Sequence, residues 1–329
     1  MGGKVMVTGG CGMVGAFVCR GLLSNGYEPV VVDTRTDRLL VTDIAQHCAF
    51  DAADVRDLPR LLEIAKAHKV DAIIHLAGLV GPDVERHPWS SIQINLLGTV
   101  TVLECARLAG IARVSFPSSK MVYVPVPERH RHPTYDPVPE DIALSPQKLY
   151  AKLKRTNEDL ASHYASTYGL DVVALRFGSA FAPGKAGRFS ITNPVMSMIE
   201  AAAAGTPYQV ETGGDQCDDL CYSGESANGF LAVLGSAPRH GHFRVYNISH
   251  GELVSLRQMA ETLQDMIPGW RVEIGPGLDY RNYGLGAYFR MSLKKASEEI
   301  GYRPKFDFRL AAADYIETQR RLNKSRSNR

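Results

Sequence analysis

The sequence predicts an α/β protein built on a doubly wound parallel sheet, with a smaller mixed α/β region after about residue 180. Two observations lead to this fold class. Short apolar runs alternate with helical stretches over the first 180 residues, and the apolar runs show no internal alternation with polar residues. Such runs suit strands that are buried on both faces, as in a parallel sheet. Strand–helix alternation then implies right-handed crossovers, which place helices on both faces of the sheet.

The expected elements follow one another in regular order. The segment 125–146 contains six prolines, which remove hydrogen-bond donors and block helices, so we expect a loop there. The last ten residues, five of them basic, are expected to fray in solvent. Strands are expected at 5–7, 29–32, 72–74, 114–116, 172–175 and 208–210, and helices at 15–24, 58–68, 99–108, 148–168, 194–204 and 256–266.

Composition narrows the classes of function. The chain of 329 residues is 45% hydrophobic and 22% charged, which is typical of one large or two fused globular domains. Its 37 Lys and Arg against 35 Asp and Glu leave no net field that would favour nucleic acid or a membrane surface. No stretch approaches the roughly 20 apolar residues of a membrane span. The six scattered cysteines, with no second pair beside Cys217 and Cys221, predict no metal site and a reduced, cytoplasmic protein.

A glycine-rich segment follows the first expected strand and opens the first helix. Gly9, Gly12 and Gly15 would let backbone amides approach a pyrophosphate, which the helix N-terminus also attracts. Asp33 ends the second expected strand, where a carboxylate accepts the ribose hydroxyls and repels a 2′-phosphate. The pattern predicts NAD rather than NADP, a preference that the nearby Arg35 and Arg38 would soften. The alternative is a glycine-rich turn with an unrelated surface acid.

Together with later motifs, these residues resemble the extended short-chain dehydrogenase/reductase family, in its NAD-dependent sugar epimerase/dehydratase group. The resemblance runs from about residue 4 to 317 and rests on the order of the motifs. It implies a Rossmann domain for NAD in residues 1–180, a mainly substrate-binding region in 181–329 with some elements returning to the sheet, and a homodimer formed through helices 99–108 and 148–168. By resemblance, the cofactor contacts are Gly9, Gly12, Met13, Val14, Gly15, Asp33, Asp54, Val55, Leu76, Ala77, Gly78, Asn95, Tyr150 and Lys154.

Tyr150 and Lys154 form a Tyr-x-x-x-Lys pair whose chemistry can be argued from the residues alone. Positions i and i+4 share one face of a helix. An ammonium near a phenol favours the phenolate, so we expect the pKa of Tyr150 to fall below its usual value of about 10. The phenolate would take a proton from a substrate alcohol, while Ser119 holds the same oxygen in place. The alternatives are an ordinary amphipathic helix and, for Ser119, a hydroxyl that caps a turn.

Departures from the family pattern bear on the substrate. Lys120 and Met121 stand where dehydratases of the group carry an Asp–Glu pair, which argues against 4,6-dehydration. Ser179 and Asp218 stand where nucleotide-sugar members carry Asn and Arg. An acid at the second position would repel a diphosphate. The segment from Leu175 to Ser179 resembles the form that this motif takes in uronate dehydrogenases, which act on free sugars.

The sequence therefore predicts an NAD-dependent oxidoreductase for a sugar, sugar acid or related polyhydroxy compound. Ser119, Tyr150 and Lys154 are the expected catalytic residues. One alternative is a nucleotide-sugar epimerase similar to UDP-glucose 4-epimerase, and another is a dinucleotide-binding protein without activity. His75 is expected to be a packed residue, and His130 and His132 either gate the substrate or lie on an exposed loop. The expected substrate contacts are Ser119, Ser179, Arg188 and Arg281.

Overall fold

The main body of the protein is a seven-stranded parallel sheet. We describe a computed structural model for residues 2–35, 37–183 and 193–327, with side chains up to residue 323. The strand order β10-β6-β5-β4-β1-β2-β3 reverses direction between β1 and β4, where a doubly wound sheet opens a crevice. The strands are β1 (Lys4–Thr8), β2 (Glu28–Asp33), β3 (Ala49–Ala52), β4 (Ala72–His75), β5 (Arg113–Ser119), β6 (Asp171–Phe177) and β10 (Phe243–Ile248).

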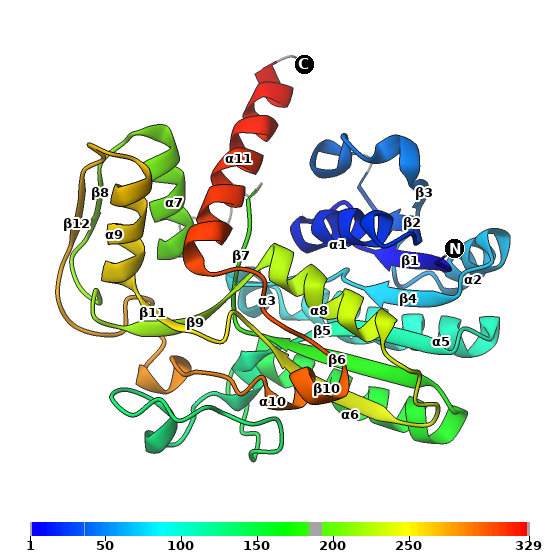
Figure 1. Cartoon of the computed structure of the whole chain (residues 1–329). Helices are drawn as coiled ribbons and strands as arrows, with labels where there is room; N and C mark the ends of the chain where they lie inside the picture. The colour runs from blue at the N-terminus through cyan, green and yellow to red at the C-terminus, as the bar shows by residue number, and fades with distance from the viewer. Residues whose placement is uncertain (1, 36, 184–192, 328–329) are drawn as a thin grey trace.

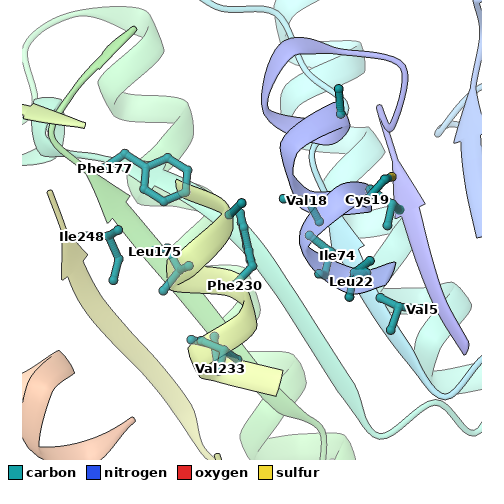
Figure 2. Packing of buried hydrophobic residues seen from close by; sticks show 14 of the residues in the cluster. Val5, Val18, Cys19, Leu22, Ile74, Leu175, Phe177, Phe230, Val233 and Ile248 are labelled. Atoms are coloured by element: carbon teal, nitrogen blue, oxygen red, sulfur yellow. The ribbon is translucent and has the colours of Figure 1, made fainter. Parts of the chain in front are cut away.

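Helices cover both faces of this sheet. On one face α1 (Met13–Ser24) packs beside α8 (Ser223–Gly235), and their apolar side chains meet those of the strands, as Figure 2 shows for Val18, Leu22 and Phe230. The other face is covered by α2 (Leu58–His68), α5 (Gly98–Ala109) and α6 (Leu149–Tyr168). Because both faces are buried, the strands are apolar without alternation, which is the pattern that predicted them.

A smaller lobe lies beside the carboxyl ends of the strands (Figure 1). It has its own apolar core, built mainly by the helices of the C-terminal half. This mixed lobe and the parallel sheet confirm the predicted fold class. The lobe contains the three-stranded sheet of β7 (Ser179–Phe181), β9 (Cys217–Tyr222) and β11 (Leu253–Ser255), the pair β8 (Tyr208–Val210) and β12 (Val272–Ile274), and the helices α7 (Pro194–Ala204), α9 (Leu256–Met266) and α11 (Phe308–Ser327).

Short elements connect these parts. Two late elements, β10 and α8, belong to the large sheet although they follow residue 180. A division of the chain at that residue therefore stays a prediction about domains. The connecting elements are η1 (Leu39–Val41), η2 (Ala45–His47), α3 (Pro82–Arg86), α4 (Pro88–Ser91), η3 (Ile92–Leu97), η4 (Lys120–Tyr123), η5 (Glu128–His130), η7 (Leu285–Ala287) and α10 (Lys294–Glu299).

The C-terminal segment differs from the sequence expectation. Instead of fraying over the last ten residues, the chain continues as α11 to Ser327. Helix α11 packs on α7 and α9 through Ala311, Ala312 and Tyr315, and Leu322 is still buried. The basic residues obscured this apolar face, which has the 3.6-residue period of a packed helix.

The continuous helical run 88–109, formed by α4, η3 and α5, is the one helix in the described residues that is long and apolar enough to cross a membrane by length and composition. In its most apolar window, 44% of the residues are buried in the protein. A core helix passes the same test, and the inner face of this run packs against α2 and α6.

Candidate active site

A pocket of about 600 Å³ opens at the carboxyl ends of the central strands. Its wall includes the start of α1, the loop after β4, the end of β5 and the first turn of α6, and β7 and residues 281–288 close it from the smaller lobe. The pocket thus lies at the point where the strand order reverses, which is where open α/β sheets bind their ligands. Most of the predicted site residues reach this pocket from separate elements.

The glycine-rich segment forms a tight cradle beside the loop after β4. Gly9 has a positive φ of 71°, and a Cβ added there would lie 2.7 Å from the backbone N of Ala77. A Cβ on Gly15 would overlap with the carbonyl oxygen of Gly9. Helix α1 begins directly after Gly12, and Met13 and Val14 in its first turn line the pocket. Only glycine fits at two of these positions, and the backbone they shape suits a pyrophosphate at a helix N-terminus.

Asp33 is tied to the glycine cradle at the end of β2. Its Oδ2 accepts a hydrogen bond from the backbone N of Cys11 at 3.1 Å, and its Oδ1 accepts one from the backbone N of Arg35 at 3.0 Å. The guanidinium of Arg38 stacks on Phe50, 3.9 Å from the ring centroid. The cradle offers backbone donors for a pyrophosphate and the fixed acid offers an acceptor for ribose hydroxyls, so the residues present fit NAD.

The predicted adenine contacts lie further along the same edge. The carboxylate of Asp54 is held by the Arg56 side chain, with Nη2 to Oδ2 at 2.6 Å, and these hydrogen bonds lower the pKa of Asp54. Val55 is buried against Gly98, where a Cβ would approach its Cγ2 to 2.8 Å. Neither residue lines the pocket, which therefore covers the inner part of the predicted NAD site only.

Asn95 fixes the loop that carries Leu76, Ala77 and Gly78. Its Oδ1 accepts a hydrogen bond from the backbone N of Leu79 at 2.7 Å, and its Nδ2 donates to the Leu79 carbonyl at 2.9 Å. The residue lies in η3, a π-helical stretch of the kind often found at functional sites. Asn95 thus shapes the pocket wall through the backbone.

His75 is a packed residue, as the sequence predicted. Its Nδ1 and Nε2 hydrogen-bond the hydroxyls of Thr8 and Thr99 at 2.7 and 3.2 Å. Burial, reinforced by the charge of Lys154, lowers the pKa of His75 to about 3. The ring is therefore neutral at physiological pH and serves to join β1, β4 and α5.

Ser119, Tyr150 and Lys154 meet in the pocket. Ser119 ends β5, and its hydroxyl hydrogen-bonds the phenol of Tyr150 and accepts a bond from the backbone N of Met121 at 3.2 Å. Tyr150 and Lys154 lie one turn apart on α6, with the Nζ of Lys154 5.7 Å from the centroid of the Tyr150 ring. That Nζ donates to the carbonyl of Pro117 at 2.6 Å. The three side chains thus come from two adjacent elements and face one space.

The expected fall in the pKa of Tyr150 is wrong for the protein alone. Burial raises the pKa of Tyr150 to about 12, although its hydrogen bond with Ser119 opposes this rise. Burial also lowers the pKa of Lys154 to about 8, against the charge of Glu158. Attraction between ammonium and phenolate, the basis of the prediction, favours both charges. The loss of water around the two groups disfavours each charge and outweighs that attraction here.

Glu85 is a pocket residue that the sequence analysis missed. Its carboxylate accepts hydrogen bonds from the backbone N of Leu149 at 3.3 Å and of Tyr150 at 3.1 Å. It therefore satisfies the first free amides of α6 and holds the turn that carries the phenol. The residue lies on α3, 65 positions from Tyr150, and no local pattern marks it.

A buried network braces the end of β5. Glu158 accepts a hydrogen bond from Ser118 at 2.6 Å and pairs with Arg176 at 2.7 Å. Arg176 also donates to the hydroxyl of Tyr123 at 2.8 Å. Because all these side chains are buried and paired, the strand end that presents Ser119 is held on both sides.

Asp218 is not the free acid that the sequence analysis placed against a diphosphate. Lys120 forms a buried ion pair with it, Nζ to Oδ1 at 2.5 Å. Ser179 donates to its Oδ2 at 2.5 Å, and Arg281 approaches the same oxygen at 3.6 Å. The two unusual residues of the sequence, Lys120 and Asp218, thus neutralise each other across 98 positions of chain. Both line the pocket, together with Ser179 and Arg281.

Three further predictions concern Arg188, the histidines of the proline-rich segment, and a metal site. Arg188 lies outside the described residues. His130 is buried, with its Nδ1 2.8 Å from the carbonyl oxygen of Asp136, and neither His130 nor His132 is among the described residues that line the pocket. No group of metal-ligating side chains occurs in the described part of the chain.

The chain is similar to a known protein family and to named relatives. The model of the NAD dependent epimerase/dehydratase family matches residues 5–249. A putative UDP-glucose 4-epimerase of Methanocaldococcus jannaschii is 26% identical over 312 residues, covering 93% of this chain and 94% of that protein.

Solved structures share the architecture. UDP-glucose 4-epimerase of Thermus thermophilus, in complex with NAD, is 25% identical, with a TM-score of 0.78 over 96% of this chain and 99% of that one. L-threonine dehydrogenase of Clostridium difficile, at 20% identity, shares the fold with a TM-score of 0.77 over 96% and 97% of the two chains. The family model spans most of the chain, including the glycine cradle and the Tyr150 pair, and the chain therefore belongs to the NAD-dependent epimerase/dehydratase family of enzymes.

Proposed function

We propose that this enzyme transfers a hydride between a hydroxyl-bearing carbon of a compact sugar, sugar acid or related polyhydroxy compound and NAD. The observation that carries the proposal is the meeting of Ser119, Tyr150 and Lys154 beside the glycine cradle, in one pocket. The Lys120–Asp218 ion pair in the same pocket supports a substrate without a nucleotide, because Asp218 takes the place of a cation and also engages Lys120 at 2.5 Å, so that Lys120 is not free to bind a diphosphate.

Side chains of the protein would accept the proton and hold the substrate in position. When bound, NAD in its oxidised form supplies the acceptor for the hydride that leaves the carbinol carbon. Ser119 would hold the substrate oxygen by a hydrogen bond, and the Tyr150 phenolate would take the hydroxyl proton as the C–H bond breaks and the carbonyl forms. Lys154, whose ammonium is anchored by the Pro117 carbonyl, favours the phenolate electrostatically.

Steady-state assays with a matched substrate panel test this proposal. The purified enzyme with NAD is offered uronates, aldoses and hydroxy acids, and formation of NADH is followed by absorbance. We expect turnover of at least one free polyhydroxy compound. Absence of NADH with every free compound, together with conversion of a UDP-sugar, would overturn it.

A nucleotide-sugar epimerase is the second candidate, and the names of the relatives favour it: the M. jannaschii protein is a putative UDP-glucose 4-epimerase. An epimerase returns the hydride to the opposite face of the same carbon, so it must retain its cofactor. This candidate predicts NAD that co-purifies with the protein and a rise in melting temperature with UDP. The oxidoreductase proposal predicts that UDP leaves the melting temperature unchanged.

We also propose that two copies pair through the outer face of α4, η3 and α5 together with α6, in a reducing cytoplasmic setting. This face exposes large apolar side chains, among them Trp89 at 75%, Leu97 at 43% and Leu108 at 46% exposure. All six cysteines are free thiols. Light scattering on a gel-filtration column should give the mass of a dimer, and Trp89→Glu should shift it to the monomer mass of 36.0 kDa. An unchanged mass in the variant would place the interface elsewhere.

A further inference from the structure

A cluster of three charged side chains lies in the same pocket as Ser119. It consists of Lys120, Asp218 and Arg281, and Ser179 and Tyr280 touch it; we call it the Lys120 cluster. The side chains of Lys120 and Asp218 are 5% and 1% exposed, and that of Arg281 is 13% exposed. Two cations therefore share one carboxylate in a place that is shielded from water but open to the pocket.

The hydrogen-bonding capacity of Asp218 is filled by the protein itself. Its Oδ1 accepts from Lys120 and from the backbone N of Asp219 at 2.9 Å. Its Oδ2 accepts from Ser179 and from Tyr280 at 3.3 Å. Burial raises the pKa of Asp218, but the charges of Lys120 and Arg281 outweigh it and hold the pKa below the ordinary value. Asp218 is thus an ionised anchor that fixes the positions of the cations around it.

Two donors of Arg281 meet no acceptor in the described part of the chain. Its Nη2 stands 3.6 Å from Asp218, beyond a hydrogen bond, and both Nε and Nη2 are buried without an acceptor among the described residues. A buried donor without an acceptor destabilises the protein, because it has lost its hydrogen bonds to water. The guanidinium fork matches a carboxylate, which can accept two parallel N–H bonds from it.

The neighbouring acid Asp219 does not supply that acceptor. Its carboxylate is turned to a different set of partners, the Ser249 hydroxyl and the backbone N of Met291, each at 2.9 Å. Burial raises the pKa of Asp219 to about 7, against these hydrogen bonds. Asp219 therefore gives the Lys120 cluster no firm second counter-charge near neutral pH, and Nε and Nη2 of Arg281 keep no acceptor among the described residues.

We infer that the Lys120 cluster is a subsite for a single carboxylate of the substrate, with Arg281 as its main ligand and Asp218 as the residue that positions Lys120 and Arg281. The substrate class is then a compact polyhydroxy acid, oxidised at a carbinol that Ser119 and Tyr150 hold. This inference rests on the proposed function and narrows it. A neutral sugar would leave one buried cation uncompensated, whereas a carboxylate neutralises it.

Matched acid and neutral ligands test the subsite. D-Glucuronate, D-galacturonate and D-gluconate are compared with D-glucose, D-galactose and sorbitol, on the NAD-loaded protein. Melting temperature reports binding without turnover, and NADH formation reports kcat and KM. We expect at least one acid to raise the melting temperature and to exceed its neutral partner in kcat/KM by roughly 10- to 100-fold, the worth of charge-assisted hydrogen bonds.

A charge-removing variant assigns the effect to Arg281. Arg281→Met should raise KM for the preferred acid by roughly tenfold or more and leave KM for the neutral partner within about twofold. Arg290→Met is the matched control, since Arg290 is exposed on the same segment, donates to the Gly251 carbonyl and does not line the described pocket. It should keep the preference for the acid.

The possible results distinguish failure of the carboxylate subsite from failure of the proposed function. Neutral compounds turned over as well as acids, or an acid preference that survives in Arg281→Met, would overturn the subsite and leave the oxidoreductase proposal intact. A larger rise in melting temperature with UDP-glucose than with any acid would assign Arg281 to a diphosphate and overturn it too. Failure of every free compound to yield NADH or to raise the melting temperature would overturn both proposals.

Discussion

At the scale of single residues, the chemistry depends on one half-buried phenol, that of Tyr150. Tyr150→Phe removes the proton acceptor but keeps the ring, so we expect kcat to fall by about 10²- to 10⁴-fold, the usual worth of general acid–base catalysis. The glycine cradle and Asp33 are untouched, so affinity for NAD, measured by fluorescence titration, should stay within about twofold. Turnover at the original rate in the variant would exclude Tyr150 from proton transfer.

His75 makes the stability of the protein depend on pH. Burial lowers its pKa in the folded protein to about 3, from about 6.5 in the unfolded chain. Below about pH 6.5 the unfolded chain binds a proton that the folded protein excludes, so the free energy of unfolding falls as the pH drops. His250, whose burial lowers its pKa to about 4, acts in the same direction.

We therefore expect His75→Gln to make the free energy of unfolding depend less steeply on pH in the acid range. The slope of unfolding free energy against pH, from urea titrations between pH 4.5 and 6, should decrease by as much as about 1.4 kcal/mol per pH unit, the value for one proton. His240→Gln, at an exposed turn, is the control and should keep the original slope. Equal slopes in wild type and His75→Gln would mean that His75 is not buried as a neutral ring.

At the scale of elements, the site depends on where α6 begins. Glu85→Ala removes the carboxylate that accepts the backbone amides of Leu149 and Tyr150. We expect a loss of about 1 kcal/mol of stability, typical of a lost helix cap, and a fall in kcat larger than the change in KM for NAD. Asp83→Ala on the same short helix, with no such contact, is the matched control. If kcat is unchanged in Glu85→Ala, the capping carboxylate does not position the phenol.

Elements with strong local signals were predicted closely. The helix at 58–68 matches α2 to the residue, because Asp57 caps it and its apolar positions repeat with a helical period. The helix α8 was missed, since Ser223, Gly224 and Gly229 give it a low propensity. Its glycines serve packing: a Cβ on Gly229 would lie 3.1 Å from Ile248 on β10. Tertiary contact, not local preference, makes this segment a helix.

At the scale of the whole molecule, a buried ion cluster joins the last three strands of the large sheet. Asp171 at the start of β6 pairs with Arg113 on β5 at 2.7 Å and with Arg244 on β10 at 2.6 Å. Arg113 also donates to the carbonyl of Val233 at the end of α8, at 2.8 Å. Elements from both halves of the chain are therefore bound to one carboxylate.

Removing the charge of Asp171 should destabilise the folded protein strongly. We expect Asp171→Asn to lower the free energy of unfolding by about 3–5 kcal/mol, because two buried guanidinium groups lose their counter-charge. Asp159→Asn breaks an exposed pair with Arg155 and should cost less than about 1 kcal/mol. Urea denaturation measures both. A loss for Asp171→Asn as small as that of the control would show that the cluster does not hold the sheet together.

The sequence by itself determined the doubly wound sheet, the glycine cradle with Asp33, and the Tyr150–Lys154 pair. These depend on period, turn chemistry and helical spacing, which are local and visible in the order of residues. Only the tertiary structure decided that Lys120 and Asp218 neutralise each other, that Glu85 caps α6, and that the phenol's pKa is raised. Those features arise from burial and from contacts between residues 65 to 98 positions apart, where the chain's path through space sets the distance between charges.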